Sequence, residues 1–422
     1  MRMEKQRALV PSVLCVGGED HDLRIPFLLR LHDHGFRVIA AGTGRSDPFA
    51  RAGLEYHHYR FDRFANPLAD WHAIGRLAKL LTDVQPDLVQ TFDTKPNVLV
   101  PLAARRAFEK VLLVRTINGM GWLYSSRSPM ALGLRPVYQA LQAVAASSSA
   151  ATVFQNRADQ AFFERRRMTG SSPSRLIPGS GIDIERFERA QAAGPPPERL
   201  REALGLGASE VVITVTRLTR QKGISTLLAA AALVHQIRPG VRFLLVGPRQ
   251  SEGPFAIAQA EIDRHAPYVM ALGRRSDVPA LLGLANVFAF PTEYREGVPR
   301  VLLEAALARL PIVTTNMPGC SDVVTDGRTG FLVPPRSPSA LAARIIDLLR
   351  DREQAEAMGR HAASFVAQEF NLGLTVARYA ALYSELLERR DRKTVTDPAR
   401  ESTSREWMTE GDAAARREEL VG

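Results

Sequence analysis

The sequence predicts an α/β protein made of two doubly wound, parallel-sheet domains that follow each other along the chain and face each other across a cleft. Short apolar runs alternate with helical patterns through both halves, which is typical of parallel sheets covered on both faces. The pattern breaks once, in 171–208, where three consecutive prolines (195–197) mark a boundary. With 422 residues, 45% of them hydrophobic, the chain is long enough for two to three domains.

Each half supplies its own set of strands and helices. In the first half we expect strands at 9–16, 36–41, 87–92, 110–116 and 151–155, with helices at 22–34, 69–84 and 97–108. In the second half the expected strands are 211–217, 241–247, 269–273, 287–291, 311–315 and 330–334, and the expected helices are 222–237, 255–264, 278–285, 299–309 and 338–350. Residues 354–389 have a helical, apolar-periodic pattern, and the polar segment after them is expected to be a loose tail.

Composition excludes several classes of protein. Two cysteines cannot form a disulfide framework or a cysteine-rich metal site, and they agree with a reducing cytoplasm. No run of about 18 uncharged apolar residues is present, so no transmembrane helix is expected. The basic and then apolar start of the chain could imitate a signal peptide, but Gly17, Gly18 and two acidic residues follow without a cleavage site, and a first strand is the better interpretation.

The positive charge is concentrated in the first half. The net charge is +10, and residues 1–200 hold 27 Lys and Arg against 19 Asp and Glu. This excess suits nucleic acid, an anionic membrane surface or a phosphorylated substrate. An ordinary solvated, arginine-rich face explains it equally well.

The segment VTRLTRQKGIS (215–225) places two cations after a strand. Arg217 stands at the expected strand end, and Lys222 and Gly223 open the next helix. Cations at the carboxyl end of a strand, beside a helix N-terminus, can bind a diphosphate through charge-assisted hydrogen bonds. The alternative is a surface turn with solvated side chains.

Two glutamates flank the start of a later helix. Glu296 precedes Pro299, a residue tolerated at a first helical position, and Glu304 lies eight positions further on. If one helix held both, their side chains would lie about 80° apart and could line one wall. The backbone N–H groups of Gly297, Val298 and Arg300 would point outward as anion donors. Sugar and ribose hydroxyls would suit such carboxylates, although Glu304 could instead pair with a neighbour.

Two glycine-rich turns also follow strands. VGGED contains Gly17 and Gly18, where backbone could approach a phosphate, and TINGMG contains Asn118. Neither turn is a dinucleotide or P-loop fingerprint, and plain tight turns explain them nearly as well. Sequence motifs for a zinc protease, a cysteine metal site, a nucleophile elbow or an Asp-x-Asp metal site are absent. The early histidines are interpreted as surface or packing residues, with His21 left open.

At this point the sequence resembles the retaining glycosyltransferases of family GT4, which have the GT-B fold, and within them the bacterial branch that builds capsule, O-antigen and lipid-linked glycans. The resemblance covers roughly 10–385. The matching stretches are 94–107, 116–126, 151–163, 177–187, 216–224 and 293–335. The last is the most specific, because Glu296 and Glu304 reproduce the family's E-x7-E pattern.

The resemblance implies a role for each matching position. Arg217 and Lys222 would hold the donor diphosphate, and Glu296 would contact hydroxyls of the transferred sugar. The remaining donor-binding positions are Gly17, Gly18, Asn118, Arg275, Gly297, Val298, Arg300 and Glu304, with Glu304 on the ribose and the backbone of Arg275 on the base. The implied domains are an acceptor-binding domain at 1–190, a nucleotide-sugar domain at 191–365, returning helices at 366–390 and a disordered tail at 391–422.

Two departures from the family pattern stand out. Many members have a histidine where this chain has Asn118, and an amide cannot serve as a general acid or base. This agrees with a mechanism in which the departing phosphate takes the proton of the acceptor, but it could also mean altered sugar choice or weakened activity. Residues 319–322 read GCSD where related enzymes often read GCRE.

The resemblance predicts a metal-independent transfer of a hexose or N-acetylhexosamine, with a UDP-sugar as substrate and no cofactor. The acceptor would be a lipid-linked or polysaccharide glycan, met from the cytoplasm at the inner face of the plasma membrane. The segment 122–146 mixes Trp122, Tyr124 and Met130 with Arg127 and Arg135, which suits peripheral contact with an anionic membrane; a core helix plus loop is the alternative.

Three rival functions remain open from sequence. A nucleotide-sugar epimerase of the same architecture would also hold a diphosphate between two such domains. A degenerate subunit without catalysis is kept open by Asn118. Nucleic-acid binding depends on charge alone, because no basic stripe interleaved with aromatics is present, and no nucleic-acid partner is expected.

Overall fold

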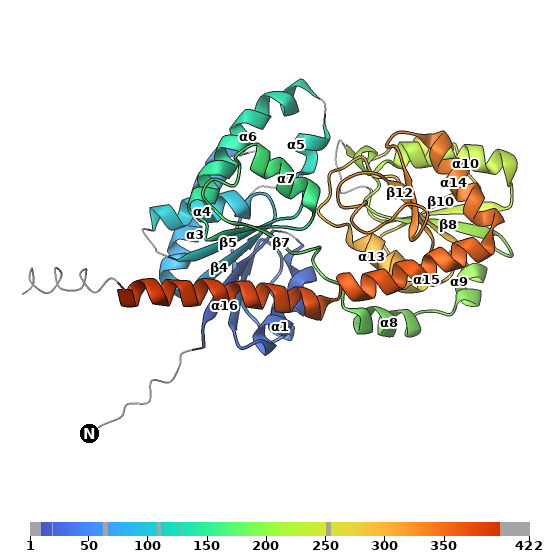
Figure 1. Cartoon of the computed structure of the whole chain (residues 1–422). Helices are drawn as coiled ribbons and strands as arrows, with labels where there is room; N and C mark the ends of the chain where they lie inside the picture. Colours follow the sequence, from blue (N-terminus) through green and yellow to red (C-terminus); the bar gives the residue numbers. More distant parts are fainter. Residues whose placement is uncertain are drawn as a thin grey trace, which may run out of the picture. The chain divides into compact units, whose positions relative to one another are not determined.

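In the computed structural model, two separate parallel sheets form the core of the chain (Figure 1). The structure describes residues 10–18, 20–61, 66–107, 111–126, 128–249 and 255–396. Contacts divide the chain into two compact units, Met1–Arg378 and Tyr379–Gly422, and both sheets belong to the first. The predicted α/β class with two doubly wound parallel sheets is confirmed.

The first sheet has seven strands in the order β3-β2-β1-β4-β5-β6-β7, and every paired neighbour runs parallel. Its strands are β1 (Ser12–Val16), β2 (Arg37–Gly42), β3 (Glu55–His58), β4 (Leu88–Phe92), β5 (Leu112–Ile117), β6 (Ala151–Phe154) and β7 (Ser174–Leu176). Its helices are η1 (His21–Arg24), α1 (Ile25–Asp33), α2 (Asp47–Arg51), α3 (Pro67–Val84), α4 (Pro96–Arg106), α5 (Gly121–Ser125), α6 (Pro129–Ser147) and α7 (Arg157–Arg165). The strand order reverses between β1 and β4, the place where ligands bind in such sheets.

The second sheet has six strands in the order β10-β9-β8-β11-β12-β13, also parallel throughout. Its strands are β8 (Glu210–Val215), β9 (Val241–Val246), β10 (Val269–Gly273), β11 (Val287–Phe290), β12 (Ile312–Thr315) and β13 (Gly330–Val333). Its helices are α8 (Ile184–Ala192), α9 (Pro197–Ala203), η2 (Arg220–Lys222), α10 (Ile224–Ile237), α11 (Gln259–Asp263), α12 (Val278–Gly283), α13 (Arg300–Leu307), α14 (Pro338–Arg350) and α15 (Arg352–Glu369). The last helix, α16 (Leu372–Thr396), begins in the first compact unit and continues into the second. Here the order reverses between β8 and β11.

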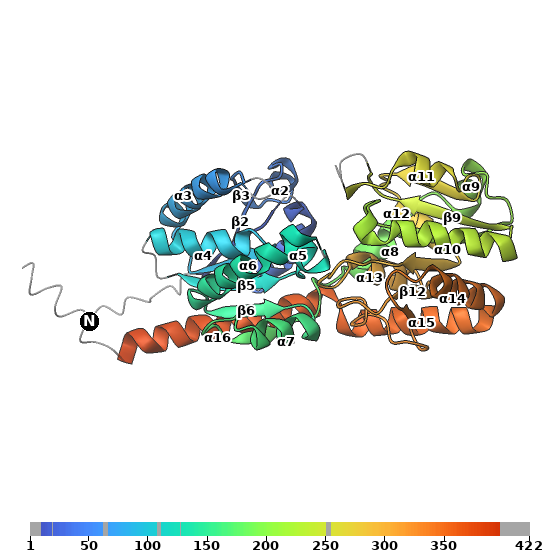
Figure 2. The same ribbon diagram turned by 90° about the horizontal axis from the view of Figure 1, so that it is seen from above.

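The alternation of buried strands and helices explains the cores. In the second sheet one apolar cluster includes Phe288 and Leu302, and another includes Phe243 and Ile345, so both faces are covered. A third cluster, with Leu14 and Val89, packs against the first sheet. Figure 2 shows the strands of both sheets and the helices beside them from above.

The three prolines at 195–197 separate two helices and also begin the second of them. α8 ends at Ala192, and Pro197 then occupies the first position of α9, where its missing N–H costs nothing. The predicted domain boundaries stay predictions, as does the return of 366–390 to the first domain. α16 continues to Thr396, so the first six residues of the predicted tail are helical, and 397–422 lie outside the described residues.

Candidate active site

The glycine turn after β1 is packed against its surroundings. The Gly17 N–H donates to the Ala41 carbonyl at 2.9 Å, and the Tyr59 hydroxyl donates to the Gly17 carbonyl at 2.9 Å. A Cβ at Gly17 would clash with the His21 ring, so no side chain fits there. The Gly18 N–H, predicted to face a phosphate, donates instead to Asp93 Oδ2 at 3.0 Å.

Asp93 is a functional candidate that the sequence analysis missed. It follows β4, so it stands on the other side of the switch point from Gly18, in left-handed backbone with φ 70°. Its Oδ1 accepts from Arg24 Nη2 at 2.9 Å and from Asn118 Nδ2 at 3.1 Å. Burial raises the pKa of this carboxyl, but Arg24 and the Gly18 N–H outweigh burial and hold the pKa below its ordinary value. An ionised Asp93 therefore ties three chain segments together.

His21 is a packing residue of this same region. It is almost fully buried, and burial lowers its pKa to about 3, so the ring is neutral at ordinary pH. Its Nε2 lies 3.1 Å from the Cys15 carbonyl, which can only accept, so the proton sits on Nε2. The ring stacks on Phe49.

Lys222 and Glu296 form an ion pair, and both side chains are mostly buried. The pair joins η2, which follows β8, to the loop after β11, the two strands at the switch point of the second sheet. The Lys222 ammonium also lies 5.0 Å from the centroid of the Tyr294 ring. Gly223 fixes this arrangement, because its φ is 72° and a Cβ there would clash with the Pro291 carbonyl.

Three glycines allow the Glu296 loop to pack closely. Gly119 follows Asn118 and makes an isolated antiparallel bridge with Glu296. A Cβ on Gly119 would meet the 295–297 backbone, and one on Gly319 would clash with the Gly297 carbonyl. Gly297 itself has no room for a side chain beside Gln155. Val298 packs into the core, so any donor contact there comes from its backbone.

Side chains from α5 and α7 hold the same loop. Asn156, the N-cap of α7, donates from Nδ2 to the carbonyls of Glu296 and Gly297 at 3.3 and 3.1 Å. Arg295 Nη2 donates to the buried Asp159 carboxylate at 2.8 Å, and the Arg295 N–H donates to Ser125 Oγ at 2.9 Å. The sequence analysis missed these contacts, which join residues 136 to 170 positions apart in the sequence.

The other predicted donor residues lie in separate local settings. α13 begins at Arg300, so Glu296 lies outside that helix and the angular argument relating it to Glu304 does not apply. Arg300 Nε donates to Glu304 Oε1 at 3.0 Å, which is the neighbouring ion pair that the sequence left open. Arg275 makes two bonds to Asp277, at 2.8 and 2.6 Å, and these raise its pKa. Arg217 lies two residues past the end of β8.

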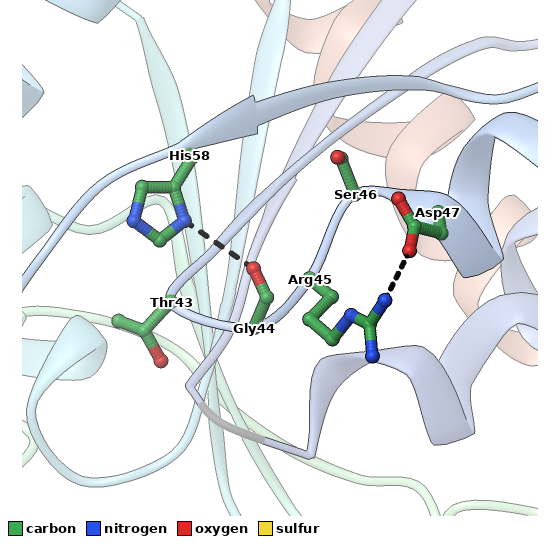
Figure 3. Close-up of a pocket in the computed structure, with 6 residues that line it drawn as sticks. All are labelled: Thr43, Gly44, Arg45, Ser46, Asp47 and His58. Atoms are coloured by element: carbon green, nitrogen blue, oxygen red, sulfur yellow. Dashed lines mark hydrogen bonds and ion pairs between the residues drawn. The ribbon is translucent and has the colours of Figure 1, made fainter.

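A separate hollow of about 410 Å³ lies where β2 ends, lined by Thr43, Gly44, Arg45, Ser46, Asp47 and His58 (Figure 3). Its ionic groups are engaged locally: Arg45 pairs with Asp47 at 2.6 Å, and His58 Nδ1 lies 3.3 Å from the Gly44 carbonyl. It contains none of the predicted site residues. Among the described residues, no three His, Cys, Asp or Glu gather as metal ligands, and no helix is long and apolar enough to cross a membrane.

Each half of the chain matches the profile of a known protein family. Residues 27–186 match the profile described as Glycosyltransferase Family 4, and residues 198–365 match Glycosyl transferases group 1. The N,N'-diacetylbacillosaminyl-diphospho-undecaprenol alpha-1,3-N-acetylgalactosaminyltransferase of Campylobacter jejuni is 24% identical, over 88% of this chain and 97% of its own. The UDP-Gal:alpha-D-GlcNAc-diphosphoundecaprenol alpha-1,3-galactosyltransferase of Escherichia coli is 25% identical, over 76% and 81%.

Solved structures share the fold. HepE of Anabaena, in complex with UDP and glucose, superposes with a TM-score of 0.69 at 21% identity, over 88% of this chain and 99% of its own. WaaG, a glycosyltransferase involved in lipopolysaccharide biosynthesis, gives 0.67 at 17% identity, over 88% and 99%.

Proposed function

Because the chain belongs to the family 4 glycosyltransferases, we propose that it moves a hexose or N-acetylhexosamine from a UDP-sugar to a lipid-linked or polysaccharide acceptor in bacterial cell-surface glycan synthesis. The observation that carries the proposal is the Lys222–Glu296 pair at the switch point of the second sheet. One cation and one carboxylate held together there can meet, respectively, a diphosphate and the hydroxyls of a sugar.

We propose a donor contact for each of these residues. Lys222 and Arg217 would take the diphosphate oxygens, and Glu296, freed from Lys222, would accept hydrogen bonds from the transferred sugar. The backbone N–H groups of Gly297, Val298 and Arg300 would add neutral donors. Glu304 would exchange Arg300 for the ribose hydroxyls. In the first domain, Gly17 and Gly18, whose N–H groups donate to Ala41 and Asp93, would lie against the donor phosphate through close backbone packing alone.

The proposed transfer retains the anomeric configuration and needs no metal. As the glycosidic bond stretches, negative charge gathers on the departing diphosphate, and Lys222 and Arg217 stabilise it as preorganised cations. Asn118 cannot take a proton, so the departing phosphate oxygen would receive the proton of the acceptor hydroxyl on the same face of the sugar. The carbon–oxygen bond to phosphate breaks as the bond to the acceptor oxygen forms.

The acceptor class depends on the relatives. The Campylobacter jejuni and Escherichia coli proteins are both named for undecaprenol-diphosphate-linked acceptors. A lipid-linked acceptor of this kind lies at a membrane surface. We therefore expect this chain to act there as a peripheral protein, at the inner face of the plasma membrane.

A panel of nucleotide sugars tests the donor. One UDP-sugar should raise the melting temperature, because a ligand at 100 times its Kd adds about 2.7 kcal/mol, and slow UDP release should persist in EDTA. Glu296→Ala and Arg217→Ala should abolish release, whereas Arg344→Ala on the exposed face of α14 should not. Stabilisation without release, or an epimerised sugar as product, would contradict transfer. No response to any nucleotide sugar would favour a non-catalytic subunit.

A further inference from the structure

The free face of α6 is entirely apolar. Its exposed positions before Ser147 are Pro129, Met130, Leu132, Gly133, Leu134, Pro136, Val137, Ala140, Leu141 and Val144. The six large side chains among them are 40% to 64% exposed. In the described part of the chain fourteen large hydrophobic side chains are exposed, and these six lie on one helix. Isolated exposed apolar residues are ordinary, but a continuous strip marks an interaction surface.

The polar side chains of α6 turn towards the protein. Arg135 donates to the carbonyls of Leu123 and Ser126 at 3.1 and 2.9 Å, and it lies 5.1 Å from the Tyr124 ring centroid. Gln142 is buried and accepts from Arg115 at 2.9 Å. This corrects the sequence analysis, which placed Tyr124 and Arg135 in the membrane patch. Arg127 and the Trp122 side chain lie outside the described structure.

Exposed cations border this strip. α4 packs between α3 and α6 (Figure 2) and presents Arg105 and Arg106 at its C-terminal end. Arg105 bonds the neutral hydroxyl of Ser147 at 2.9 Å, and Arg106 lies 5.2 Å from the ring centroid of the exposed Trp71. α3, on the other side of α4, carries the exposed Arg76 and Lys79.

The described parts of these three helices expose few acidic groups. Among the described residues of α3, α4 and α6, Asp83, near the end of α3, is the single exposed acid. A second copy packed face to face through these same three helices would offer the arginines no exposed carboxylate but Asp83 among the described residues. Anionic lipid headgroups supply the missing negative charge, and acyl chains accept the apolar strip.

We propose that α6 lies in the plane of an anionic bilayer, with its strip from Met130 to Val144 inserted at the headgroup boundary and Arg105 and Arg106 on lipid phosphates. The inference rests on the proposed function for its purpose, since a lipid-linked acceptor is met at such a surface. Ser125, at the end of α5, touches the loop of Glu296, so this surface begins beside the candidate active site.

Vesicle flotation tests the surface. The wild type should bind vesicles with 30% phosphatidylglycerol at low salt, bind pure phosphatidylcholine at least tenfold less, and dissociate as salt rises. Leu134→Glu with Val137→Glu and Leu141→Glu should lower binding at least tenfold. All three side chains are exposed, so the fold should tolerate them. Leu233→Glu with Ile237→Glu, on the exposed side of α10, is the matched control and should bind as the wild type does.

Depth-dependent quenching gives an independent readout. The tryptophan of Val137→Trp should be quenched by brominated acyl chains, and that of Ile237→Trp should not. Equal loss of binding in the α6 and α10 variants would overturn the proposal. So would a wild-type dimer in solution that the α6 variant converts to monomer, which would assign the face to a second copy.

The experiments distinguish a failure of the proposed membrane surface from a failure of the proposed transferase function. Nucleotide-sugar stabilisation of the protein in solution needs no membrane, so the α6 variant should keep the full wild-type shift in melting temperature. Wild-type protein that releases UDP yet ignores anionic vesicles would overturn the surface and leave the transferase. Vesicle binding that depends on α6, in a protein unresponsive to nucleotide sugars, would support the membrane surface and overturn the transferase function.

Discussion

At the scale of single residues, Asp93 fixes the orientation of Asn118. A carboxylate held ionised can only accept hydrogen bonds, so the Asn118 amide must turn Nδ2 towards it. The buried Asn118 Oδ1 then points away and has no hydrogen-bond partner among the described residues. A hydroxyl of a bound sugar, which donates, would complete it.

Asp93→Asn should therefore impair turnover more than folding. The variant removes the negative charge opposite Arg24 and lets the Asn118 amide turn over, and we expect kcat/KM to fall at least tenfold, with a stability loss of about 2 kcal/mol. Steady-state kinetics and urea unfolding measure the two effects. Asp47→Asn, which breaks an exposed pair with Arg45, is the control and should change neither by a measurable amount. An unchanged kcat/KM in Asp93→Asn would contradict the role of Asp93 in orienting Asn118.

Glu296→Gln should separate nucleotide binding from turnover. The change frees Lys222 from its carboxylate partner, so UDP alone should bind as tightly as before or more tightly, while kcat falls at least 100-fold because the sugar loses its charged acceptor. Titration calorimetry with UDP and a transfer assay give the two numbers. Lys222→Ala is the counterpart and should weaken both; weaker UDP binding in Glu296→Gln would contradict this assignment.

Sequence alone pointed to Lys222 and Glu296 because each follows a strand and matches a family motif. The structure brings these two into contact, while their roles stay predictions. Asp93, Arg295 and Asp159 escaped notice because an isolated acid or arginine in a charged sequence carries no local signal. Their contacts depend on how segments distant in sequence meet.

At the scale of elements, the N-terminal turn of α7 acts as a clamp on the Glu296 loop. Asp159→Ala should cost about 3 to 5 kcal/mol, because it leaves the Arg295 guanidinium without its carboxylate partner in a mostly buried place. The milder Asp159→Asn should keep the fold and raise the donor KM through displacement of Glu296. Glu356→Ala, which removes an exposed helical pair with Arg360, is the control and should shift stability by less than about 0.5 kcal/mol. A wild-type KM in Asp159→Asn would show that the clamp is structural only.

The strand predictions were most accurate where the strands are most buried. The central strands are continuous apolar runs and were expected close to their observed places. β3 and β7 were missed because EYHH and SRL are short, polar edge strands that bury little. The segment of α6 was ambiguous because its outward face is as apolar as a core face, so periodicity could not say which side meets the protein.

At the scale of the whole molecule, the two cysteines give one reporter for each sheet. Cys15 lies in β1 and Cys320 in the core of the second sheet; both are fully buried, and burial raises the pKa of each to about 12. Native protein should react with a thiol reagent at least about 100-fold more slowly than protein in urea. Cys15→Ala leaves Cys320 to report opening of the second sheet alone, and rapid labelling of either thiol in the native protein would contradict the burial.

The fold class was predictable because a βα alternation over 422 residues has few solutions, and the family motifs narrowed them further. The free face of α6 needed the structure, since only its packing against α4 and α5 shows which residues remain outside. Substrate identity depends on a handful of side chains at the switch points, so the fold alone does not set it.

The contact between Lys222 and Glu296 also affects which solutes bind only weakly at this site. A small anion such as inorganic phosphate can offer the lysine a new partner, but it strands the glutamate without a donor in a poorly solvated place. A nucleotide sugar brings negative oxygens for one residue and hydroxyl protons for the other, so it can replace both halves together. The ion pair of Lys222 and Glu296 would then favour binding of a ligand that carries both anionic oxygens and hydroxyl groups over a ligand that is only anionic.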